Sequence, residues 1–285
     1  MVHAPILTLM EVCGMVTPCI GLLQGRLTPS AGRGIQFFPF ENWQNEFPIA
    51  KEIGFSAIEL LVKRDSYAEN PLWSDEGVEE IINVSKGIAI PSVHAFFDKG
   101  VWYTEAMLRL MENAHRVGAT TVLVSFFDDN VLVSKEDMRF ACMQLAPVLS
   151  VARELSMRIG IETEMEAEKL VDFISSFRSP AVGVYYDIGN MVSMGIDVER
   201  DISILSDLIV GVHVKDRIVG GKSVPLGEGS ADFPTIFRAL KDVGYTGPFI
   251  IQGARWEGTD DVTLCAEYRN LVSSWLTETY GGDDG

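Results

Sequence analysis

The sequence has few cysteines and no long apolar run. Cys13, Cys19, Cys142 and Cys265 are scattered and form no CxxC pair, a pattern that favours reduced, buried thiols in a cytoplasmic protein. No stretch reaches the roughly 18 consecutive apolar residues of a membrane span, so we expect none. The first residues lack a basic segment, and Glu11 interrupts their apolar run, which makes a poor signal peptide.

Basic residues are also scarce. The chain has 23 Lys and Arg residues against 40 Asp and Glu residues, which gives a net charge of -17. Because binding to a nucleic-acid backbone needs a basic face, this composition argues against a nucleic-acid partner. The sequence has no glycine-rich P-loop motif, and this absence argues against nucleoside triphosphate chemistry.

The sequence does contain a repeated joint, in which an amphipathic helix is followed by a glycine and then by an apolar run. The joint occurs at Gly54, Gly87, Gly118 and Gly244, and the first three are spaced 33 and 31 residues apart. A period of that length is typical of repeated βα units. The chain of 285 residues shows no linker and no break in composition, so we predict one barrel rather than two domains.

The predicted fold class is α/β, a single-domain (β/α)8 TIM barrel. We expect residues 1–18 to be an N-terminal strap or disordered, residues 19–280 to form the barrel, and residues 281–285 to be a flexible tail. The predicted strands are residues 19–24, 57–61, 89–94, 121–126, 158–162, 183–187, 209–214 and 249–252. The clearest predicted helices are residues 46–53, 74–86, 104–117, 135–155, 233–243 and 260–278.

Four of these apolar runs end on a group that can bind a metal ion. The groups are Glu162, Asp187, His213 and Gln252. In a (β/α)8 barrel the C-terminal ends of the strands carry the active site. Carboxylate and amide oxygens suit Mg or Mn, and one imidazole also admits Co or Zn. Structural alternatives exist, because the carboxylates can cap helices or form ion pairs and a lone histidine in an apolar run can be a core residue.

Four blocks of sequence resemble a known family. They are YDIGN at 186–190, VHVKD at 212–216, VPLGEG at 224–229 and GYTGP at 244–248. Their order and spacing are similar to those of the xylose-isomerase-like TIM-barrel superfamily of sugar isomerases and epimerases. Within it the likeness is greatest to sugar-phosphate 3-epimerases, such as L-xylulose-5-phosphate 3-epimerase, and to hexulose-6-phosphate isomerase-like proteins.

The resemblance implies a site for one divalent metal ion, Mn, Mg, Co or Zn. It implies Glu162, Asp187 and His213 as ligands, with Gln252 at the position of the fourth ligand. In this family a proton is removed from a carbon next to a carbonyl, and the metal stabilises the resulting enediolate. Glu162 is the expected base.

Gln252 departs from the family pattern, in which this position is a Glu that returns the proton from the opposite face of the substrate. Gln can bind a metal through its amide oxygen but cannot act as a base. The sequence therefore leaves two possibilities. Either the protein is a one-base aldose–ketose isomerase, or another group supplies the second proton, for which Glu164, His94 and Glu228 are the candidates.

Several further residues follow the predicted strands and could contact a substrate. The predicted substrate-binding residues are His94, Glu59, Lys215, Arg217, Arg26 and Arg255. The four basic residues among them could give the entrance of the barrel a local positive charge for an anionic substrate such as a sugar phosphate. The usual alternative is that they are solvated charges on loops. Glu59 could instead support other site residues, and His94 could be a packed, hydrogen-bonded residue.

The loop after the first strand is long and aromatic. It contains Phe37, Phe38, Phe40, Trp43 and Phe47. Two interpretations are open: the rings form a small hydrophobic plug over the barrel mouth, or one of them stacks on a sugar. Exposed aromatics there would also suit a subunit contact, so a homodimer or homotetramer is one expectation.

The function predicted from the sequence is that of a divalent-metal-dependent isomerase or epimerase of a sugar or sugar phosphate. Its expected partner is a small-molecule carbohydrate substrate, with no nucleic acid and no membrane. One alternative is a metal-dependent dehydratase on the same scaffold. The other is a non-catalytic sugar-binding barrel, an alternative that remains because Gln252 replaces the Glu of the family pattern. An endonuclease is disfavoured by the charge and by the presence of only 4 histidines.

Overall fold

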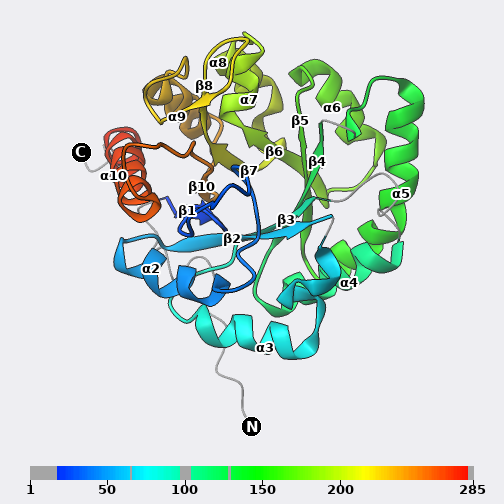
Figure 1. Ribbon diagram of the computed structural model, residues 1–285. Helices are drawn as coiled ribbons and strands as arrows, with labels where there is room; N and C mark the ends of the chain where they lie inside the picture. The colour runs from blue at the N-terminus through cyan, green and yellow to red at the C-terminus, as the bar shows by residue number, and fades with distance from the viewer. Residues whose placement is uncertain (1–17, 65, 97–103, 128–129, 282–285) are drawn as a thin grey trace.

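Eight parallel strands close into a barrel in the computed structural model, which describes residues 18–64, 66–96, 104–127 and 130–281 (Figure 1). Strands β1 to β7 pair in sequence order, and β10 closes the barrel between β7 and β1. Their bounds are Ile20–Leu23 (β1), Ala57–Lys63 (β2), Ser92–Phe96 (β3), Thr121–Phe126 (β4), Arg158–Thr163 (β5), Val182–Asp187 (β6), Ile209–Val214 (β7) and Phe249–Ile251 (β10). The predicted (β/α)8 barrel is confirmed.

Helices alternate with these strands along the chain and surround the barrel in Figure 1. They are α2 (Glu46–Glu52), α3 (Asp75–Val84), α4 (Thr104–Arg116), α5 (Lys135–Glu154), α6 (Ala167–Ser176), α7 (Ile188–Ser193), α8 (Val198–Leu205), α9 (Phe233–Asp242) and α10 (Asp261–Tyr280). Short 3₁₀ turns are η1 (Trp43–Asn45), η2 (Tyr67–Glu69), η3 (Pro71–Trp73) and η5 (Ser206–Leu208). An antiparallel hairpin, β8 (Asp216–Arg217) with β9 (Ser223–Val224), follows β7.

The glycine joints have the backbone conformation that the sequence predicts. Gly54, Gly87, Gly118 and Gly244 all have positive φ, between 77° and 92°. Each lies just beyond the end of a helix, where this left-handed conformation turns the chain back toward the next strand. The recurring joint in the sequence therefore corresponds to the recurring βα unit of the barrel.

The bounds predicted for the third strand are wrong. The sequence predicts residues 89–94, but β3 spans Ser92–Phe96. Pro91 has no N–H to donate to a neighbouring strand, and Ala89 forms only an isolated bridge with Ala57. The regular ladder therefore begins after the proline, which also places His94 in the middle of the strand rather than at its end.

Two strand glycines make room for a large side chain inside the barrel. A Cβ atom at Gly211 would lie 2.2 Å from the ring of Tyr185, and one at Gly160 would lie 2.9 Å from it. These glycines stand on β7 and β5, the two neighbours of β6. The tyrosine ring consequently fits where an ordinary inward side chain would clash with it.

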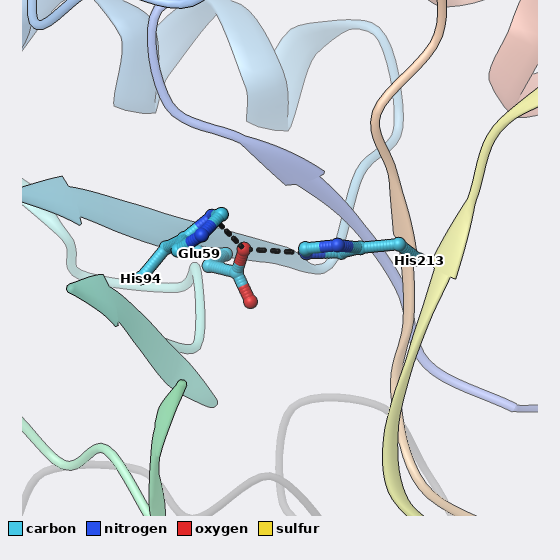
Figure 2. A group of neighbouring side chains, drawn as sticks. All are labelled: Glu59, His94 and His213. Carbon is cyan, nitrogen blue, oxygen red and sulfur yellow. Dashed lines mark hydrogen bonds and ion pairs between the residues drawn. The ribbon is translucent and has the colours of Figure 1, made fainter. Parts of the chain in front are cut away.

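Polar residues also occupy the barrel interior. Glu59 on β2, His94 on β3 and His213 on β7 face one another across it (Figure 2). All three side chains have 0% exposure. Burial of such groups is costly unless they are paired, and here Glu59 pairs with His213 at 2.8 Å while His94 lies 2.7 Å from the Ser125 hydroxyl.

The ends of the chain lie largely outside the described residues. Of the predicted strap or disordered segment 1–18, only Pro18 is described, and of the predicted tail 281–285, only Gly281. The domain boundaries at 19 and 280 therefore stay a prediction. Within the described ranges, no helix is both long enough and apolar enough to cross a membrane.

Candidate active site

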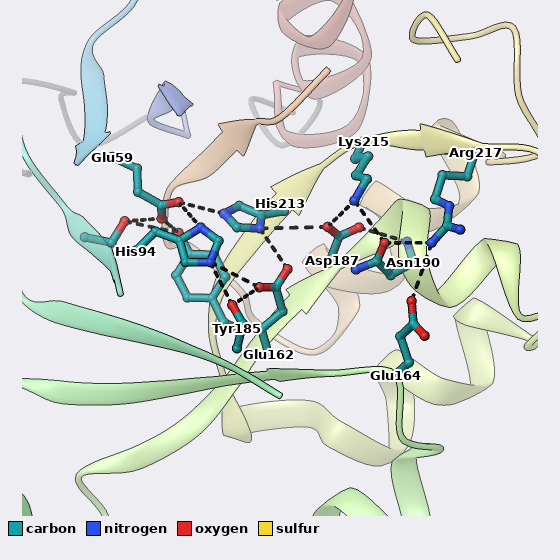
Figure 3. A network of polar contacts seen from close by, with 12 residues as sticks. Glu59, His94, Glu162, Glu164, Tyr185, Asp187, Asn190, His213, Lys215 and Arg217 are labelled. Atoms are coloured by element: carbon teal, nitrogen blue, oxygen red, sulfur yellow. Dashed lines mark hydrogen bonds and ion pairs between the residues drawn. The ribbon is translucent and has the colours of Figure 1, made fainter. Parts of the chain in front are cut away.

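Three of the four predicted metal ligands meet at the C-terminal end of the barrel (Figure 3). Glu162 lies near the end of β5, Asp187 ends β6, and His213 lies near the end of β7. The register pairs Asp187 directly with His213. Because the strands are parallel neighbours, their C-terminal ends bring the three side chains to one place.

The geometry of these residues fits a divalent metal ion. One ligand atom from each of Glu162, Asp187 and His213 lies within 4.8 Å of the other two. The His213 Nδ1 atom lies 3.3 Å from Glu162 Oε1 and 3.9 Å from Asp187 Oδ2. Two carboxylates and one imidazole form a donor set that suits Mn, Mg, Co or Zn.

Asp187 has two roles, one for each carboxylate oxygen. Its Oδ1 accepts a hydrogen bond from the backbone N–H of Asn190 at 2.8 Å and so caps α7. Its Oδ2 faces His213 and the Lys215 ammonium, which is 3.3 Å away. The capping role and the predicted metal-binding role are therefore compatible, since the cap holds the aspartate with its second oxygen toward the site.

Gln252 directly follows β10, beside the strand that carries His213. Its backbone N–H donates to the carbonyl oxygen of Val214 at 2.9 Å, and the residue is buried. The register of β10 on β7 pairs Ile251 with Val214, so Gln252 lies alongside Lys215. Its roles as a metal ligand and in catalysis stay predictions.

Glu162 is buried, and both of its oxygens have partners. Its Oε2 accepts the hydroxyl of Ser125 at 2.8 Å, and its Oε1 faces His213 Nδ1 at 3.3 Å. Burial alone would raise the pKa of Glu162, but the hydrogen bond and charge of His213 outweigh burial and lower the pKa to about 2. The carboxylate is thus ionised at neutral pH, as a base must be.

The two histidines of the site differ in charge. Burial lowers the pKa of His94 to about 4 despite the nearby carboxylates of Glu162 and Glu59. Burial also opposes the charge of His213, but Glu59 and Glu162 outweigh burial and raise the pKa of His213 to about 10. These pKa values leave His94 neutral at neutral pH and His213 protonated on both nitrogens.

Glu59 and His94, predicted to bind substrate, contact other site residues. Glu59 Oε1 lies 2.8 Å from His213 Nε2. His94 Nε2 lies 2.7 Å from the Ser125 hydroxyl that reaches Glu162. Since neither has any exposed surface, a direct contact with substrate stays a prediction.

Lys215 and Arg217 lie beside the metal group and converge on Asn190. The Lys215 ammonium is 2.9 Å from Asn190 Oδ1, and the Arg217 guanidinium is 3.0 Å from the same oxygen. Arg217 also approaches Glu164 at 3.5 Å and donates to the carbonyl of Gly221 across the β8–β9 turn. Both cations keep some exposure, and their predicted role in substrate binding stays open.

Arg26 and Arg255 hold the first loop. Arg26 donates to the carbonyl oxygen of Ile35, and Arg255 donates to that of Thr28 at 3.0 Å. Arg255 also pairs with Asp261 at the start of α10 at 2.7 Å. Burial, together with the charge of Arg255, lowers the pKa of Arg26 to about 10, so Arg26 stays charged. Their predicted contact with substrate is untested, and their contacts in the structure are to the first loop and, for Arg255, also to Asp261.

The aromatic residues of the first loop mostly pack against one another. Phe38 lies 6.4 Å from Trp43 and Trp43 lies 6.2 Å from Phe47, measured between ring centroids. These rings and Phe37 are buried, and Phe40 remains 41% exposed. The packed cluster therefore describes Phe38, Trp43 and Phe47, whereas Phe37 lies against Arg33 and Arg255. Phe40 contacts Phe38 edge-on, with ring centroids 4.8 Å apart, and keeps the largest exposed surface of the five rings.

Three residues of the site have no counterpart among the predicted ones. Tyr185 and Ser92 both donate to Glu59 Oε2 at 2.6 Å, and Ser125 donates to Glu162. One signal was available for Tyr185, because Gly160 and Gly211 occupy neighbouring strands and leave space for its ring. The serines give no such signal, since a serine in a strand is common.

Comparison with known proteins identifies the family to which this fold is similar. The family model for the xylose isomerase-like TIM barrel matches residues 47–262. L-ribulose-5-phosphate 3-epimerase UlaE of Escherichia coli K12 is 27% identical over 262 residues, covering 84% of this chain and 91% of the relative.

Solved structures show the same fold. A structure of L-ribulose 3-epimerase has a TM-score of 0.70 at 16% identity, covering 93% of this chain and 96% of the other. A xylose isomerase-like TIM barrel protein from Mycobacterium smegmatis in complex with magnesium has a TM-score of 0.66 at 21% identity, with coverages of 93% and 98%.

Proposed function

The chain belongs to the xylose isomerase-like TIM barrel family, and we propose that it is a divalent-metal-dependent enzyme that isomerises or epimerises a sugar or a sugar phosphate. The observation that carries this proposal is the meeting of Glu162, Asp187 and His213 at the C-terminal end of the barrel. The similarity to an L-ribulose-5-phosphate 3-epimerase supports a phosphorylated pentulose as the first substrate to test.

Glu162, Asp187 and His213 would hold the ion, with the amide oxygen of Gln252 as the proposed fourth ligand. When bound, such an ion supplies charge stabilisation to the substrate oxygens next to the carbon that loses its proton. The magnesium complex of the M. smegmatis protein supports a divalent ion in this fold.

Glu162 would remove the proton from the carbon next to the carbonyl. Its carboxylate is ionised because His213 lowers its pKa to about 2, against the effect of burial. The Ser125 hydroxyl holds one of its oxygens at 2.8 Å, which fixes the direction of the other. A positioned general base typically contributes about 10²–10⁴-fold in rate.

The return of the proton separates an epimerase from an isomerase. In a one-base isomerase Glu162 itself delivers the proton to the neighbouring carbon on the same face. In an epimerase a second group acts on the opposite face, and Gln252 cannot do so. Of the candidates, Glu164 is partly exposed beside Arg217, His94 is fully buried, and Glu228 is exposed on the loop after β9.

Lys215 and Arg217 would bind the anionic part of the substrate. They lie at the same end of the barrel as the metal group, and both retain exposed surface in an otherwise acidic protein. A sugar phosphate would gain charge-assisted hydrogen bonds from them. Lys215 is the nearer of the two to the ligands, because it contacts Asp187 directly.

The proposed function is tested by solvent hydrogen exchange. The protein with Mn²⁺ or Mg²⁺ is incubated in D₂O with a panel of pentose and hexose phosphates and free ketoses, and each sugar is followed by NMR. We expect deuterium to enter one sugar at the carbon beside its carbonyl. Glu162→Gln should slow this exchange at least about 100-fold, whereas Glu166→Gln, on an exposed residue at the start of α6, should not.

The products distinguish the alternatives. Inversion at carbon 3 identifies an epimerase, and movement of the carbonyl identifies an isomerase. Loss of water with a new ultraviolet absorption band would identify a dehydratase. Binding of a sugar with no exchange would favour the non-catalytic barrel, and neither binding nor exchange with any sugar would refute the proposal.

A further inference from the structure

Glu59 is a buried acceptor at the centre of a network that spans the barrel. Its carboxylate stands on β2, and it contacts donors from the neighbouring strand β3 and from β6 and β7 (Figures 2 and 3). It has 0% exposure, as does His213. A charge placed there must be fully compensated by its neighbours.

Each oxygen of Glu59 has an assigned partner. Oε2 accepts the hydroxyls of Ser92 and Tyr185, both at 2.6 Å. Burial, together with the charge of Glu59, raises the pKa of Tyr185 well above its usual value, so the phenol keeps its proton and donates it. Oε1 is left for the Nε2 atom of His213, 2.8 Å away.

This arrangement determines how His213 is presented to the proposed metal site. Because Glu59 accepts a hydrogen bond from Nε2, that nitrogen carries a proton. The ring is then fixed with Nδ1 toward Glu162 Oε1 and Asp187 Oδ2, at 3.3 Å and 3.9 Å. When Nδ1 loses its own proton, its lone pair points at the place where the two carboxylates converge.

We propose that Glu59 is a positioning residue that fixes the tautomer and the ring orientation of His213, so that Nδ1 is the nitrogen offered to the divalent ion. This inference rests on the proposed metal-dependent function. Carboxylates that accept the second N–H of a metal-binding histidine orient the ring and raise its basicity, and their loss costs about 10- to 100-fold in metal affinity or activity.

A competing assignment is that Glu59 is itself a metal ligand. Glu59, His94 and His213 also offer atoms that lie within 4.8 Å of one another, and His94 Nδ1 has no hydrogen-bond partner in the described part of the chain. Two observations favour positioning. The contact from Glu59 to His213 is already at hydrogen-bond distance, and the other oxygen of Glu59 is occupied by two hydroxyls.

Two substitutions separate the hydrogen bond from the charge. Glu59→Gln keeps an oxygen that can accept from His213 Nε2 but removes the charge. Glu59→Asp keeps the charge but withdraws it by one methylene from His213. If Glu59 acts through its hydrogen bond to His213, Glu59→Gln should bind metal more tightly than Glu59→Asp; a purely electrostatic or structural role predicts the reverse order or no difference.

The test is a calorimetric titration of Mn²⁺ and Zn²⁺ into metal-depleted wild type, Glu59→Gln, Glu59→Asp and Glu59→Leu, with circular dichroism as the check of folding. We expect one ion per chain, about 10- to 100-fold weaker binding in Glu59→Asp and Glu59→Leu, and a smaller loss in Glu59→Gln. If Glu59→Leu does not fold, the comparison of the Gln and Asp variants still decides the question.

A spectroscopic measurement adds a readout that does not depend on affinity. In zinc-loaded protein labelled with ¹⁵N-histidine, His213 is assigned by its loss in His213→Ala. We expect its spectrum to show a protonated Nε2 and a metal-bound Nδ1. The opposite assignment, with metal on Nε2, would overturn the proposal.

Other outcomes also have defined meanings. Two ions in wild type and one in both Glu59→Leu and His94→Ala would make Glu59 a ligand of its own ion and refute the positioning role. Unchanged affinity in the folded variants, with wild type still binding one ion, would refute the role of Glu59 and leave the proposed function standing. No binding to wild type would refute both.

Discussion

At the scale of single residues, Gln252 as the proposed fourth ligand would limit the possible chemistry most, because an amide cannot act as a base. Glu162 and Asp187 provide two negative charges to the proposed ion, and an amide in place of a third carboxylate keeps an oxygen donor while removing its charge. Gln252 follows β10 and lies alongside Lys215 on β7. Lys215 pairs with Asp187 at 3.3 Å, and an amide at position 252 adds no second carboxylate beside it.

Restoring the carboxylate at this position should strengthen metal binding. At an effective dielectric constant of about 20, an added charge about 4 Å from an ion is worth a few kcal/mol, part of which the cost of burial offsets. We expect Gln252→Glu to bind Mn²⁺ about 10-fold or more tightly than wild type, and Gln252→Ala to bind it more weakly. Titration of the metal-depleted proteins measures both changes.

A matched substitution on the surface serves as the control for Gln252→Glu. Gln44 is a partly buried glutamine that pairs with Glu80 at the surface, so Gln44→Glu adds the same charge elsewhere. If Gln252→Glu and Gln44→Glu leave the affinity equally unchanged, residue 252 does not face the ion.

The residues of the site were predictable from sequence to different degrees. The grouping of Glu162, Asp187 and His213 could be predicted because each lies at or near the end of an apolar run, and the C-terminal ends of barrel strands meet. Tyr185 was not predicted, because its signal, Gly160 and Gly211, lies on two other strands and is recognised only once the strand order is known. Glu59 was predicted to contact substrate, but its partner His213 lies 154 positions away in sequence, a pairing that no local pattern encodes.

At the scale of elements, the segment from β1 to α2 is organised by one buried carboxylate. Glu46, at the start of α2, accepts the backbone N–H groups of Gly25 at 2.8 Å and Leu27 at 3.0 Å. It also accepts the hydroxyl of Thr28 at 3.1 Å. Burial outweighs these hydrogen bonds and raises the pKa of Glu46 to about 7, so the first loop depends on a group that titrates near neutrality.

The free energy of unfolding should depend on pH through the titration of Glu46. Its folded-state pKa of about 7 lies above the unfolded value of 4.5, so its contribution is fully present below pH 4.5 and is lost as the pH rises through 7. We expect the wild type to lose roughly 3 kcal/mol of unfolding free energy across this window relative to Glu46→Gln. Urea denaturation of both proteins at pH 4.5, 6 and 8 measures the difference.

Comparison with Glu46→Gln removes the contribution of all other titrating groups. The control is Glu41→Gln, which changes an exposed carboxylate of the same loop and should follow the wild type at every pH. A difference between wild type and Glu46→Gln that stays constant with pH would show that Glu46 does not titrate in this range.

The elements themselves were predicted well where their ends have local signals. The helix α5 begins at Lys135 as predicted, because Ser134 and Asp137 form a capping box. The third strand was misplaced because the apolar pattern continues on both sides of Pro91. The pattern alone does not show that the ladder begins only after the proline. The β8–β9 hairpin was not predicted, since its strands have two residues each and are set by Asp216, which accepts N–H groups of the loop that follows.

At the scale of the whole molecule, the barrel gathers charges that no single βα unit could stabilise. Glu59, Glu162 and Asp187 come from β2, β5 and β6, and the two cations in contact with them, His213 and Lys215, lie on or just after β7. Three carboxylates against two cations leave one negative charge uncompensated in the buried group. A divalent ion held by this group, with His213 neutral, would bring this balance to zero.

This charge balance predicts that a bound ion stabilises the entire fold, because its ligands lie on three neighbouring strands. An ion that binds only the folded chain adds about 2.7 kcal/mol at 100 times its Kd, which corresponds to a rise of about 5 °C or more in Tm for a chain of this size. Thermal unfolding of chelator-treated protein, with and without added Mn²⁺, measures the rise. His213→Ala should not respond to the ion, whereas His115→Ala, on the exposed side of α4, should respond as wild type does.

Elemental analysis of protein purified without chelator should in parallel find about one divalent ion per chain in wild type and none in His213→Ala. A wild type that neither retains nor responds to any divalent ion would mean that the substitution at Gln252 has dismantled the site, and a sugar-binding role without catalysis would then be the better interpretation of the barrel.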